Sequence, residues 1–368
     1  MLNTLHSWCK KWRVLINTCT TKSKCVHFRK GRNTRTDFPF HIGDNTLETV
    51  ADCIYLGVLL NEKGDFSNHC NAIGKGASRA LGGIINKIHS MKEFGFKSYE
   101  KLVSSCVFPV LDYCSTVWGY KQYKQLDNVQ HRAIRYYLGV HRFAPIAAIT
   151  GDIGWLPAKY RRWLNMLRYW NRLVTLDDSR ITKTVFEHDY EICENNWCNE
   201  VKCIMSTLNL VDCFNDKRIV NLECARSRMT AYYGQLWREK VDSSPKLRTY
   251  KLFKESFGAE KYLLINCDKY ERSLLAQFRC GILPIRVETG RYIGEALDER
   301  LCRFCDEQCI ESETHFLINC SQYAEIRAQT FGTLLREDTY INSPDCEKMR
   351  TLLCEHTRKT ANFLVKTY

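Results

Sequence analysis

The sequence has no segment that would carry it into or across a membrane. No stretch of about 18 uncharged apolar residues occurs, so no transmembrane helix is predicted. The first 19 residues also lack the apolar run of a secretory signal peptide, because bulky and charged side chains interrupt them at Trp8, Lys10, Lys11, Trp12 and Arg13. We therefore expect an intracellular protein, nuclear or cytoplasmic, that is not secreted and has no membrane partner.

Motifs that cradle phosphates and constellations that perform catalysis are absent as well. Neither G-x4-G-K-[ST] nor G-x-G-x-x-G occurs. The one pair of adjacent aspartates, Asp177-Asp178, stands in a context typical of a helix end followed by a turn, not of a catalytic metal site. Four histidines lack a nucleophile elbow and are expected to be ordinary surface or core residues: His27, His41, His69 and His89. We predict no catalytic residue in this chain.

Acidic residues are missing from the first 36 positions, which hold nine Lys or Arg. Residues 118–172 hold ten Lys or Arg against Asp127 and Asp152, so the remainder of this chain of net charge +13 is acidic. Localised positive charge suits a polyanion, because phosphates neutralised by protein release their counterions. Two solvated basic faces without a ligand remain the alternative. We expect nucleic acid as the partner, since no amphipathic or lipidated membrane anchor is found.

Cysteine is abundant, with 20 among 368 residues, and without an export signal we expect reduced thiols rather than disulfides. Four chemically suited side chains form a C-x2-C-x9-H-x4-C array: Cys302, Cys305, His315 and Cys320. One C-x2-C pair is expected by chance in so Cys-rich a chain, whereas the whole array is expected only about 0.03 times. The array therefore predicts Zn²⁺, with idle thiols as the alternative and Cys309 as a competing ligand within the loop.

The predicted zinc site is structural rather than catalytic. Four protein ligands close a tetrahedral coordination sphere and leave no position for an activated water. A zinc deaminase would also need a glutamate just after its histidine ligand, and Phe316 follows His315 here.

Hydrophobic periodicity predicts a mostly α protein with a small α+β segment at its start. That segment, 1–65, combines a helix with its apolar face on Leu5, Trp8, Trp12 and Leu15 with short strands at 14–17, 25–28, 38–42 and 53–60. A helical domain over 66–176 follows, with helices at 73–91, 99–114 (kinked at Pro109), 126–138 (closed by Gly139) and 163–174. Residues 177–300 are predicted to be a helical connector with helices at 197–208, 219–241 and 270–280. Residues 301–368 are predicted to form the zinc module and one or two final helices.

Aromatic residues alternate with the basic ones across 118–172. Such a pattern suits stacking platforms for single-stranded bases, and it equally suits a helical core. Tyr137, Trp163 and Trp170 lie on apolar helix faces, so we assign these three to the core.

Read together, the segments resemble the C-terminal part of a non-LTR retrotransposon reverse transcriptase. The opening Leu5-His6-Ser7-Trp8-Cys9-Lys10-Lys11-Trp12, with 15–17 and 22–28, is similar to the palm segment after the polymerase active site, and Tyr55-Leu56-Gly57-Val58 to the primer grip hairpin. Pro109-Val110-Leu111-Asp112-Tyr113, Trp118 and Gln130-His131-Arg132-Ala133-Ile134-Arg135 resemble the thumb. Arg279-Cys280-Gly281 and the Cys/His array resemble the C-terminal zinc knuckle and the basic stretch before it.

The resemblance implies a palm end and primer grip over 1–65, a thumb over 66–176 and a zinc knuckle in 301–368. It also implies contact with RNA, an RNA–DNA hybrid or DNA through phosphates, without sequence readout. The residues assigned to these contacts are Lys10, Lys11, Arg132, Arg135, Arg161 and Arg162.

The family's polymerase motif, an aromatic, any residue and then Asp-Asp, is missing from this chain. Because two-metal phosphoryl transfer needs those carboxylates, the chain alone is expected to be inactive and to bind no Mg²⁺. Our leading interpretation is a truncated reverse transcriptase fragment that binds nucleic acid, with its apolar face on 2–60 left uncovered. The alternatives are one part of an active RNA-directed DNA polymerase whose catalytic half lies outside this sequence, and a protein-interaction module.

Overall fold

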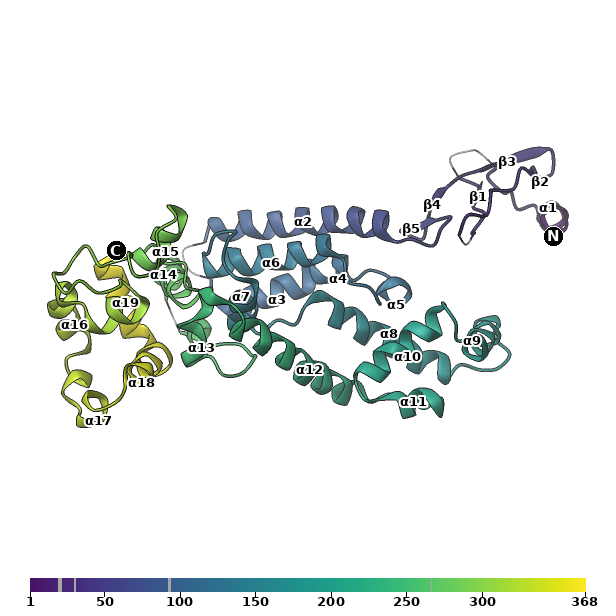
Figure 1. The fold of residues 1–368 in the computed structure, drawn as a ribbon. Coiled ribbons are helices and arrows are strands. Elements are labelled where there is room, and N and C mark those ends of the chain that lie inside the picture. The colour runs from purple at the N-terminus through teal and green to yellow at the C-terminus, as the bar shows by residue number, and fades with distance from the viewer. Residues whose placement is uncertain (19–21, 30, 92–93, 266) are drawn as a thin grey trace. The chain divides into compact units, whose positions relative to one another are not determined.

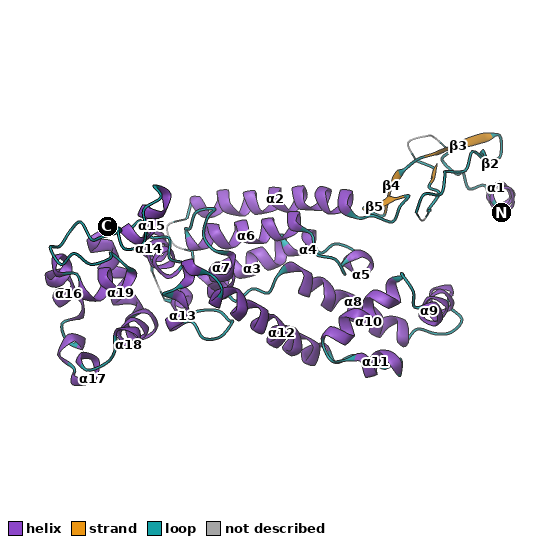
Figure 2. Cartoon of the chain, viewed as in Figure 1, coloured by secondary structure: helices purple, strands orange, loops and turns teal. Residues whose placement is uncertain are grey.

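The computed structural model describes residues 1–18, 22–29, 31–91, 94–265 and 267–368 (Figures 1 and 2). The chain divides into two compact units, Met1–Gly76 and Ala77–Tyr368. Helices dominate and the few strands form two small sheets, which confirms the predicted mostly α fold with a small α+β part.

Before α2, the described residues of the first unit form a short helix and several short strands. Its elements are α1 (Leu2–Lys11), β1 (Lys24–Cys25), β2 (Phe40–Ile42), β3 (Asn45–Thr49), β4 (Asp52–Tyr55) and β5 (Val58–Asn61). β3 lies between β1, which is parallel to it, and β2, which is antiparallel. The strand predicted over 53–60 is instead the β4–β5 hairpin, because Leu56 and Gly57 take φ values of 46° and 79°. Positive φ at both central residues is what a tight hairpin turn requires.

The apolar side chains of the first helix are exposed. α1 ends at Lys11, so the predicted helix does not extend to Leu15. Leu5, Trp8, Trp12 and Leu15 are 44%, 54%, 62% and 97% exposed. Apolar side chains within 5–15 are therefore uncovered, and exposed apolar groups of this kind favour association with other surfaces.

The second unit begins within α2 (Ser67–His89) and continues with a layered set of helices. These are α3 (Phe96–Cys106), α4 (Phe108–Leu111), α5 (Ser115–Trp118), α6 (Lys124–Leu138), α7 (Ile146–Ile153) and α8 (Ala158–Val174). The helix predicted over 99–114 is broken at Val107 rather than kinked, and Pro109 lies in the first turn of α4, where its missing N–H is not needed. The Tyr99 hydroxyl donates to the carbonyl of Ala133 at 2.7 Å and ties α3 to α6.

The remaining helices complete the same unit. They are α9 (Ile181–Ile192), α10 (Trp197–Thr207), α11 (Val211–Asn215), α12 (Leu222–Asp242), α13 (Tyr250–Phe253), α14 (Lys269–Arg279), α15 (Arg286–Tyr292), α16 (Ala324–Phe331), α17 (Asp338–Ile341), α18 (Asp345–Arg350) and α19 (Thr357–Thr367). The turn predicted at Asp177-Asp178 lies between α8 and α9, where the Asp177 carboxylate accepts from the backbone N–H of Ser179 at 2.9 Å. The prediction of one or two helices after Tyr323 is wrong: four short α-helices follow.

Gly139 ends α6 in the predicted left-handed conformation, with φ 67°, and α14 packs closely against it. A Cβ at this position would lie 2.6 Å from Cβ of Ser273. We expect Gly139→Ala to lower the free energy of unfolding by about 1–3 kcal/mol, because both the left-handed backbone and the contact disfavour it. Thermal unfolding followed by circular dichroism measures this change.

Gly83→Ala is the matched control for that substitution. Gly83 lies in α2 and a Cβ there meets no atom within 4 Å. Because alanine favours helix more than glycine does, this variant should gain about 0.5–1 kcal/mol. Equal effects of the two substitutions would contradict the close approach described at Gly139.

Candidate metal centre and basic surfaces

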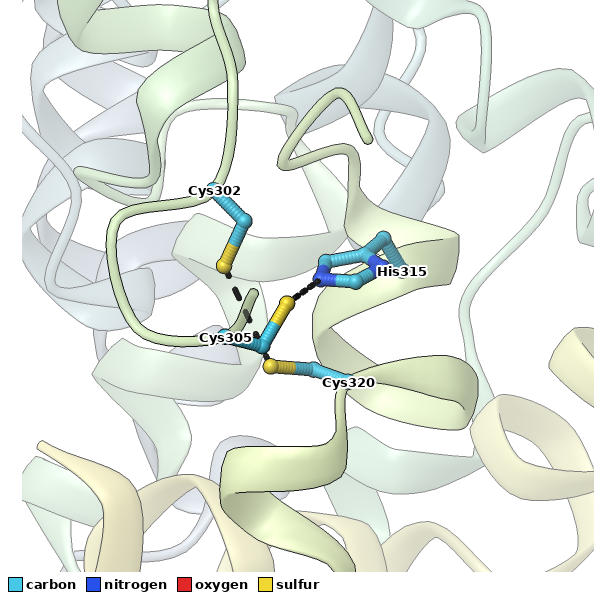
Figure 3. Close-up of side chains that lie close together, drawn as sticks. All are labelled: Cys302, Cys305, His315 and Cys320. Atoms are coloured by element: carbon cyan, nitrogen blue, oxygen red, sulfur yellow. Dashed lines mark hydrogen bonds between the residues drawn. The ribbon is translucent and has the colours of Figure 1, made fainter. Parts of the chain in front are cut away.

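A closed loop and a single helical turn bring the Cys/His array together. An antiparallel bridge between Leu301 and Ile310 and a hydrogen bond of 2.8 Å from the Cys302 N–H to the Cys309 carbonyl close the loop. His315 begins one turn of π-helix, and the N–H of Cys320 donates to its carbonyl at 2.7 Å. The wide turn places His315 and Cys320 at its two ends, both facing the loop (Figure 3).

The distances between the four side chains fit a tetrahedral zinc site. Their ligand atoms all lie within 4.8 Å of one another. The sulfurs of Cys302 and Cys320 are 3.9 Å apart, and the Cys305 sulfur is 3.4 Å from Nε2 of His315 (Figure 3). Zn–S bonds of about 2.3 Å and Zn–N bonds of about 2.0–2.1 Å imply S···S and S···N separations of about 3.8 and 3.6 Å in a tetrahedron. The four residues therefore can hold a metal ion, and their chemistry suits zinc.

Burial affects the protonation of these side chains. Cys302, His315 and Cys320 are 8%, 5% and 0% exposed. Burial raises the pKa of Cys320 to about 12 and lowers the pKa of His315 below its ordinary value. The imidazole is therefore held in the neutral form that binds metals, whereas a thiolate at Cys320 needs a neighbouring cation to exist at neutral pH.

The surroundings of the array are rigid, as a structural centre requires. Arg327 is buried and donates to the carbonyls of Leu317 at 3.1 Å and Cys320 at 2.5 Å. Phe316, next to the ligand His315, packs its ring 6.2 Å from that of Phe278 in α14 and 5.8 Å from that of Phe363 in α19. The centre thus joins the loop to the core of the second unit.

The basic residues predicted to contact phosphates are not alike in the structure. Lys10 and Lys11 are exposed at the end of α1, and Arg132 is exposed on α6. Arg135, one turn further along α6, is half-buried, and burial lowers its pKa. Lys10, Lys11 and Arg132 are therefore open to a ligand, and Arg135 only in part.

The two arginines of α8 that were predicted to contact phosphates are engaged within the second unit. Arg161 forms an ion pair with Asp112 at 2.8 Å, donates to the Gln130 side chain at 2.6 Å and lies over the ring of Phe108. Arg162 has no exposed surface and donates to the carbonyl of Lys121 at 3.1 Å. A phosphate cannot reach a fully buried guanidinium, so the contact predicted for Arg162 does not fit this geometry.

Most aromatic side chains of 118–172 belong to the core. Tyr137, Trp163 and Trp170 are 4%, 8% and 0% exposed, which confirms their assignment. Phe143 is an exception, since it is 62% exposed and lies 4.7 Å from the guanidinium of Arg142. Few base-stacking platforms are therefore available along this stretch.

A basic groove that the sequence analysis did not predict lies beside the start of α14. Two adjoining cavities of about 490 and 100 Å³ share Phe94, Cys267 and Arg272 in their walls. We define the basic groove by the charged and aromatic residues that line these cavities: His89, Phe94, Phe96, Lys97, Tyr136, Tyr137, Asp268, Lys269 and Arg272. These residues are distant from one another in the sequence, so no sequence motif predicts the groove.

Cations and rings are paired within the basic groove. The guanidinium of Arg272 lies 4.2 Å from the centre of the Tyr137 ring, and the ammonium of Lys269 lies 5.3 Å from that of Tyr136. Asp268 is the one carboxylate among the described lining residues, and it accepts from the backbone N–H of Glu271 as the cap of α14. Its charge is thus directed at the helix end, and the groove is net positive.

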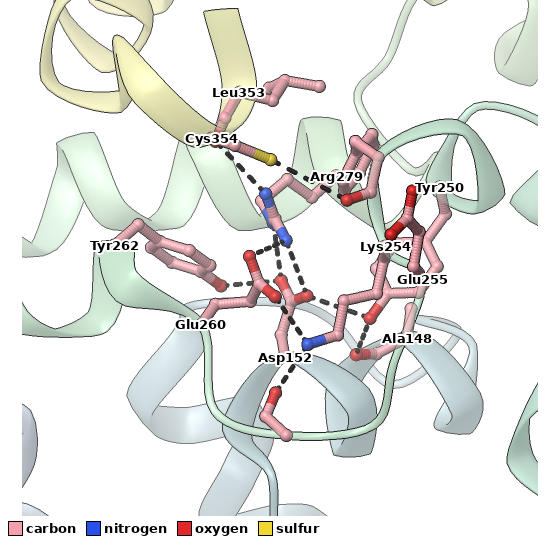
Figure 4. Close-up of polar contacts among 12 residues, drawn as sticks. Ala148, Asp152, Tyr250, Lys254, Glu255, Glu260, Tyr262, Arg279, Leu353 and Cys354 are labelled. Atoms are coloured by element: carbon pink, nitrogen blue, oxygen red, sulfur yellow. Dashed lines mark hydrogen bonds and ion pairs between the residues drawn. The ribbon is translucent and has the colours of Figure 1, made fainter. Parts of the chain in front are cut away.

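The structure also contains a buried ionic cluster that the sequence analysis did not predict (Figure 4). Arg279 binds the Asp152 carboxylate with two hydrogen bonds of 2.9 and 3.1 Å, and both side chains are fully buried. The hydroxyls of Tyr250 and Tyr262 donate to the same carboxylate at 3.0 and 2.9 Å. Glu260 forms a second ion pair with Arg279 at 2.7 Å.

The cluster corrects the interpretation of Arg279 as part of a basic stretch. Burial by itself would lower the pKa of Arg279, but the charges of Asp152 and Glu260 raise it well above its ordinary value. A signal was present in the sequence: Asp152 is a lone charge within the apolar helix of Ile146–Ile153, and a buried carboxylate requires a partner. The partner itself, 127 residues away, could not be identified.

The comparison with curated proteins gives one relevant relative. Over 137 residues the chain is 23% identical to the probable RNA-directed DNA polymerase from transposon BS of Drosophila melanogaster. This similarity supports a reverse-transcriptase-like relation over the matched region. The matched region covers 36% of this chain and only 15% of the Drosophila protein. No family model and no solved structure matches the chain.

Two further observations bear on the expectations from composition. The cysteines among the described residues are free thiols in the structure. Among the described residues, no helix is both long and apolar enough to cross a membrane.

Proposed function

We propose that this chain is a reverse-transcriptase-related protein that binds RNA or an RNA–DNA hybrid through phosphates, without sequence readout, and that lacks polymerase activity by itself. The relation to the transposon polymerase supports the class of ligand. The basic groove is the observation that carries the proposal, because it combines lysine and arginine side chains with aromatic rings in a cavity. Lys10, Lys11 and Arg132 extend the same chemistry over other exposed surfaces.

The dimensions and chemistry of the basic groove suit a single-stranded backbone. Lys97 and Lys269 are exposed ammonium groups, which contact phosphates as point charges. Phe94 and the half-buried Tyr136 offer ring surface against which a base can stack. No part of this arrangement reads a base edge, so the proposed binding is tolerant of sequence.

Charge reversal at Lys97 and Lys269 tests the proposal. Each lysine lies in the first turn of a helix, α3 or α14, where glutamate is favourable, so Lys97→Glu/Lys269→Glu should fold normally. We expect a loss of affinity for single-stranded RNA of about 10- to 30-fold at 0.1 M salt, with the salt slope of log K reduced by about 1.4–2. Filter binding or fluorescence anisotropy at several salt concentrations measures both quantities.

Two exposed arginines outside the basic groove provide the control. Arg180 precedes α9 and Arg226 lies in the second turn of α12, and neither lines the basic groove. Arg180→Glu/Arg226→Glu changes the net charge by the same amount and should retain most of the affinity. Equal losses in the two double variants would show that net charge alone attracts RNA, and no salt-dependent binding by the unchanged chain would refute the proposal.

A second candidate function is favoured by the same relative, whose name is that of a polymerase. In that case this chain is one part of an active RNA-directed DNA polymerase, and the basic groove and the metal centre serve a catalytic half encoded elsewhere in the same reading frame. Reading the transcript upstream of Met1 distinguishes the two proposals. An open frame with the paired aspartates supports the polymerase, and stop codons just upstream contradict it.

A further inference from the structure

The His315 ring stands between two sets of metal ligands. Its Nε2 faces the Cys305 sulfur at 3.4 Å, within the set already described. Its Nδ1 faces the Cys309 sulfur at 3.4 Å and the Glu307 carboxylate at 3.9 Å. The Cys309 sulfur is in turn 3.7 Å from that carboxylate. Ligand atoms of Cys305, Glu307, Cys309 and His315 lie within 4.8 Å of one another, as do those of the first set.

We propose that Cys305, Glu307, Cys309 and His315 form a reserve zinc site, which takes the ion when Cys302 and Cys320 are unavailable. The two sets share Cys305 and His315, so one centre can change between them by exchanging two ligands. The Cys309 sulfur and the Nδ1 atom already have the S···N separation of a tetrahedral zinc site, about 3.6 Å.

Backbone geometry brings the two reserve ligands together. Gln308, between Glu307 and Cys309, has φ 51°, in the left-handed region that turns the chain sharply. The Cys309 carbonyl accepts from the N–H of Cys302 at 2.8 Å, so the reserve ligands are attached to the same closed loop as the first set. The exchange therefore requires no movement of a helix.

The two sites exclude each other. Two zinc ions bound to opposite nitrogens of one imidazole would lie roughly 6 Å apart, given Zn–N bonds of about 2.0–2.1 Å. A thiolate bridging two ions through bonds of about 2.3 Å spans at most about 4.6 Å, so Cys305 cannot serve both at once. The centre binds one ion.

Ligand chemistry ranks the two sites. The first set offers three thiolates, two of them buried, at Cys302 and Cys320. The reserve set offers two thiolates and the carboxylate of Glu307, which is 42% exposed. In the intact protein zinc therefore occupies the first set, on the Nε2 side of His315. Cys309 and Glu307 then orient the Nδ1–H on the other side of the ring. Such outer partners typically contribute 10- to 100-fold to metal affinity.

Removing both buried thiols from the full-length chain tests the reserve site. In Cys302→Ser/Cys320→Ser the first set keeps only Cys305 and His315, yet we expect one zinc per chain by elemental analysis. With Co²⁺ as the probe, the thiolate charge-transfer absorbance should fall to about two thirds of that of the unchanged protein, since two of three thiolates remain. Adding Cys309→Ser should abolish stoichiometric zinc, whereas adding Cys346→Ser, an exposed thiol on α18, should not.

Two results would overturn the proposal. One is absence of zinc from Cys302→Ser/Cys320→Ser, whether or not that variant folds. The other is equal zinc retention with and without Cys309→Ser in that background. A separate measurement avoids dependence on the double variant: Glu307→Gln in the otherwise unchanged chain should weaken zinc binding about 10-fold or more in competition with a chelator. None of these measurements involves nucleic acid, so they stand apart from the proposed function.

Discussion

Arg279→Leu is expected to lower the free energy of unfolding of the second unit by about 3–5 kcal/mol, which is the cost typical of removing one partner of a buried ion pair. The guanidinium holds the Asp152 carboxylate through two hydrogen bonds, and neither side chain has any contact with solvent. Without it the carboxylate keeps only the hydroxyls of Tyr250 and Tyr262, which leaves a poorly compensated buried charge. Arg279 also donates to the Leu353 carbonyl at 3.4 Å, so the C-terminal segment loses an anchor.

Chemical denaturation followed by tryptophan fluorescence measures this loss. Arg218→Ala is the matched control, because the Arg218–Asp216 pair is 60% and 58% exposed and such pairs contribute about 1 kcal/mol or less. Asp152→Leu/Arg279→Leu should be more stable than Arg279→Leu alone, since removing both charges leaves neither unpaired. An Arg279→Leu effect no larger than that of Arg218→Ala would contradict the buried cluster.

Removing the metal is expected to unfold the segment from Leu301 to Tyr323. The free energy of structural zinc binding in small modules, about 10–16 kcal/mol, is linked to their folding and is as large as the stability of a typical domain. The segment has little regular structure beyond the bridge of Leu301 with Ile310 and the turn of His315–Asn319, so we expect a bound ion to contribute much of its stability. Chelation should therefore abolish amide protection there and lower the melting temperature, because α14 and α19 lose their packing partner Phe316.

Hydrogen exchange before and after chelation, with zinc content measured in parallel, tests this expectation. The α8 segment provides an internal control, since its core residues Tyr160 and Trp170 are buried far from the chelated loop along the chain. Re-addition of Zn²⁺ should restore protection and Mg²⁺ should not, because Mg²⁺ prefers oxygen ligands. Substoichiometric zinc with unchanged protection would instead favour the interpretation of this protein as an interaction module with idle thiols.

The local sequence pattern was sufficient to predict elements whose structure depends on residues close to one another in the chain. The periodicity of Leu126, Ala133 and Tyr137 predicted α6, and Gly139 its end, because both depend on residues within a few turns. The Cys/His array likewise predicted the metal centre, since its ligands lie within 19 positions of one another. At Leu56-Gly57 periodicity predicted one strand over 53–60, because it does not register a two-residue turn, whereas the resemblance indicated a hairpin, and a hairpin is present.

What depends on distant contacts could not be predicted. Arg162 and Lys97 are both basic in the sequence, yet the first is buried against the helical core and the second is exposed in the basic groove. Burial depends on which helices pack together, and no spacing within one helix encodes that.

The sequence by itself determined the mostly α fold and which four side chains form the Cys/His cluster, because both rest on residue type and short spacing. Only the tertiary structure decided which cations can meet a phosphate, where the basic groove lies and that Asp152 pairs with Arg279. It also placed Glu307 and Cys309 on the second nitrogen of His315. These features depend on contacts between segments that are distant in the sequence. Such contacts are stabilised by the burial of apolar surface and by the pairing of buried charges.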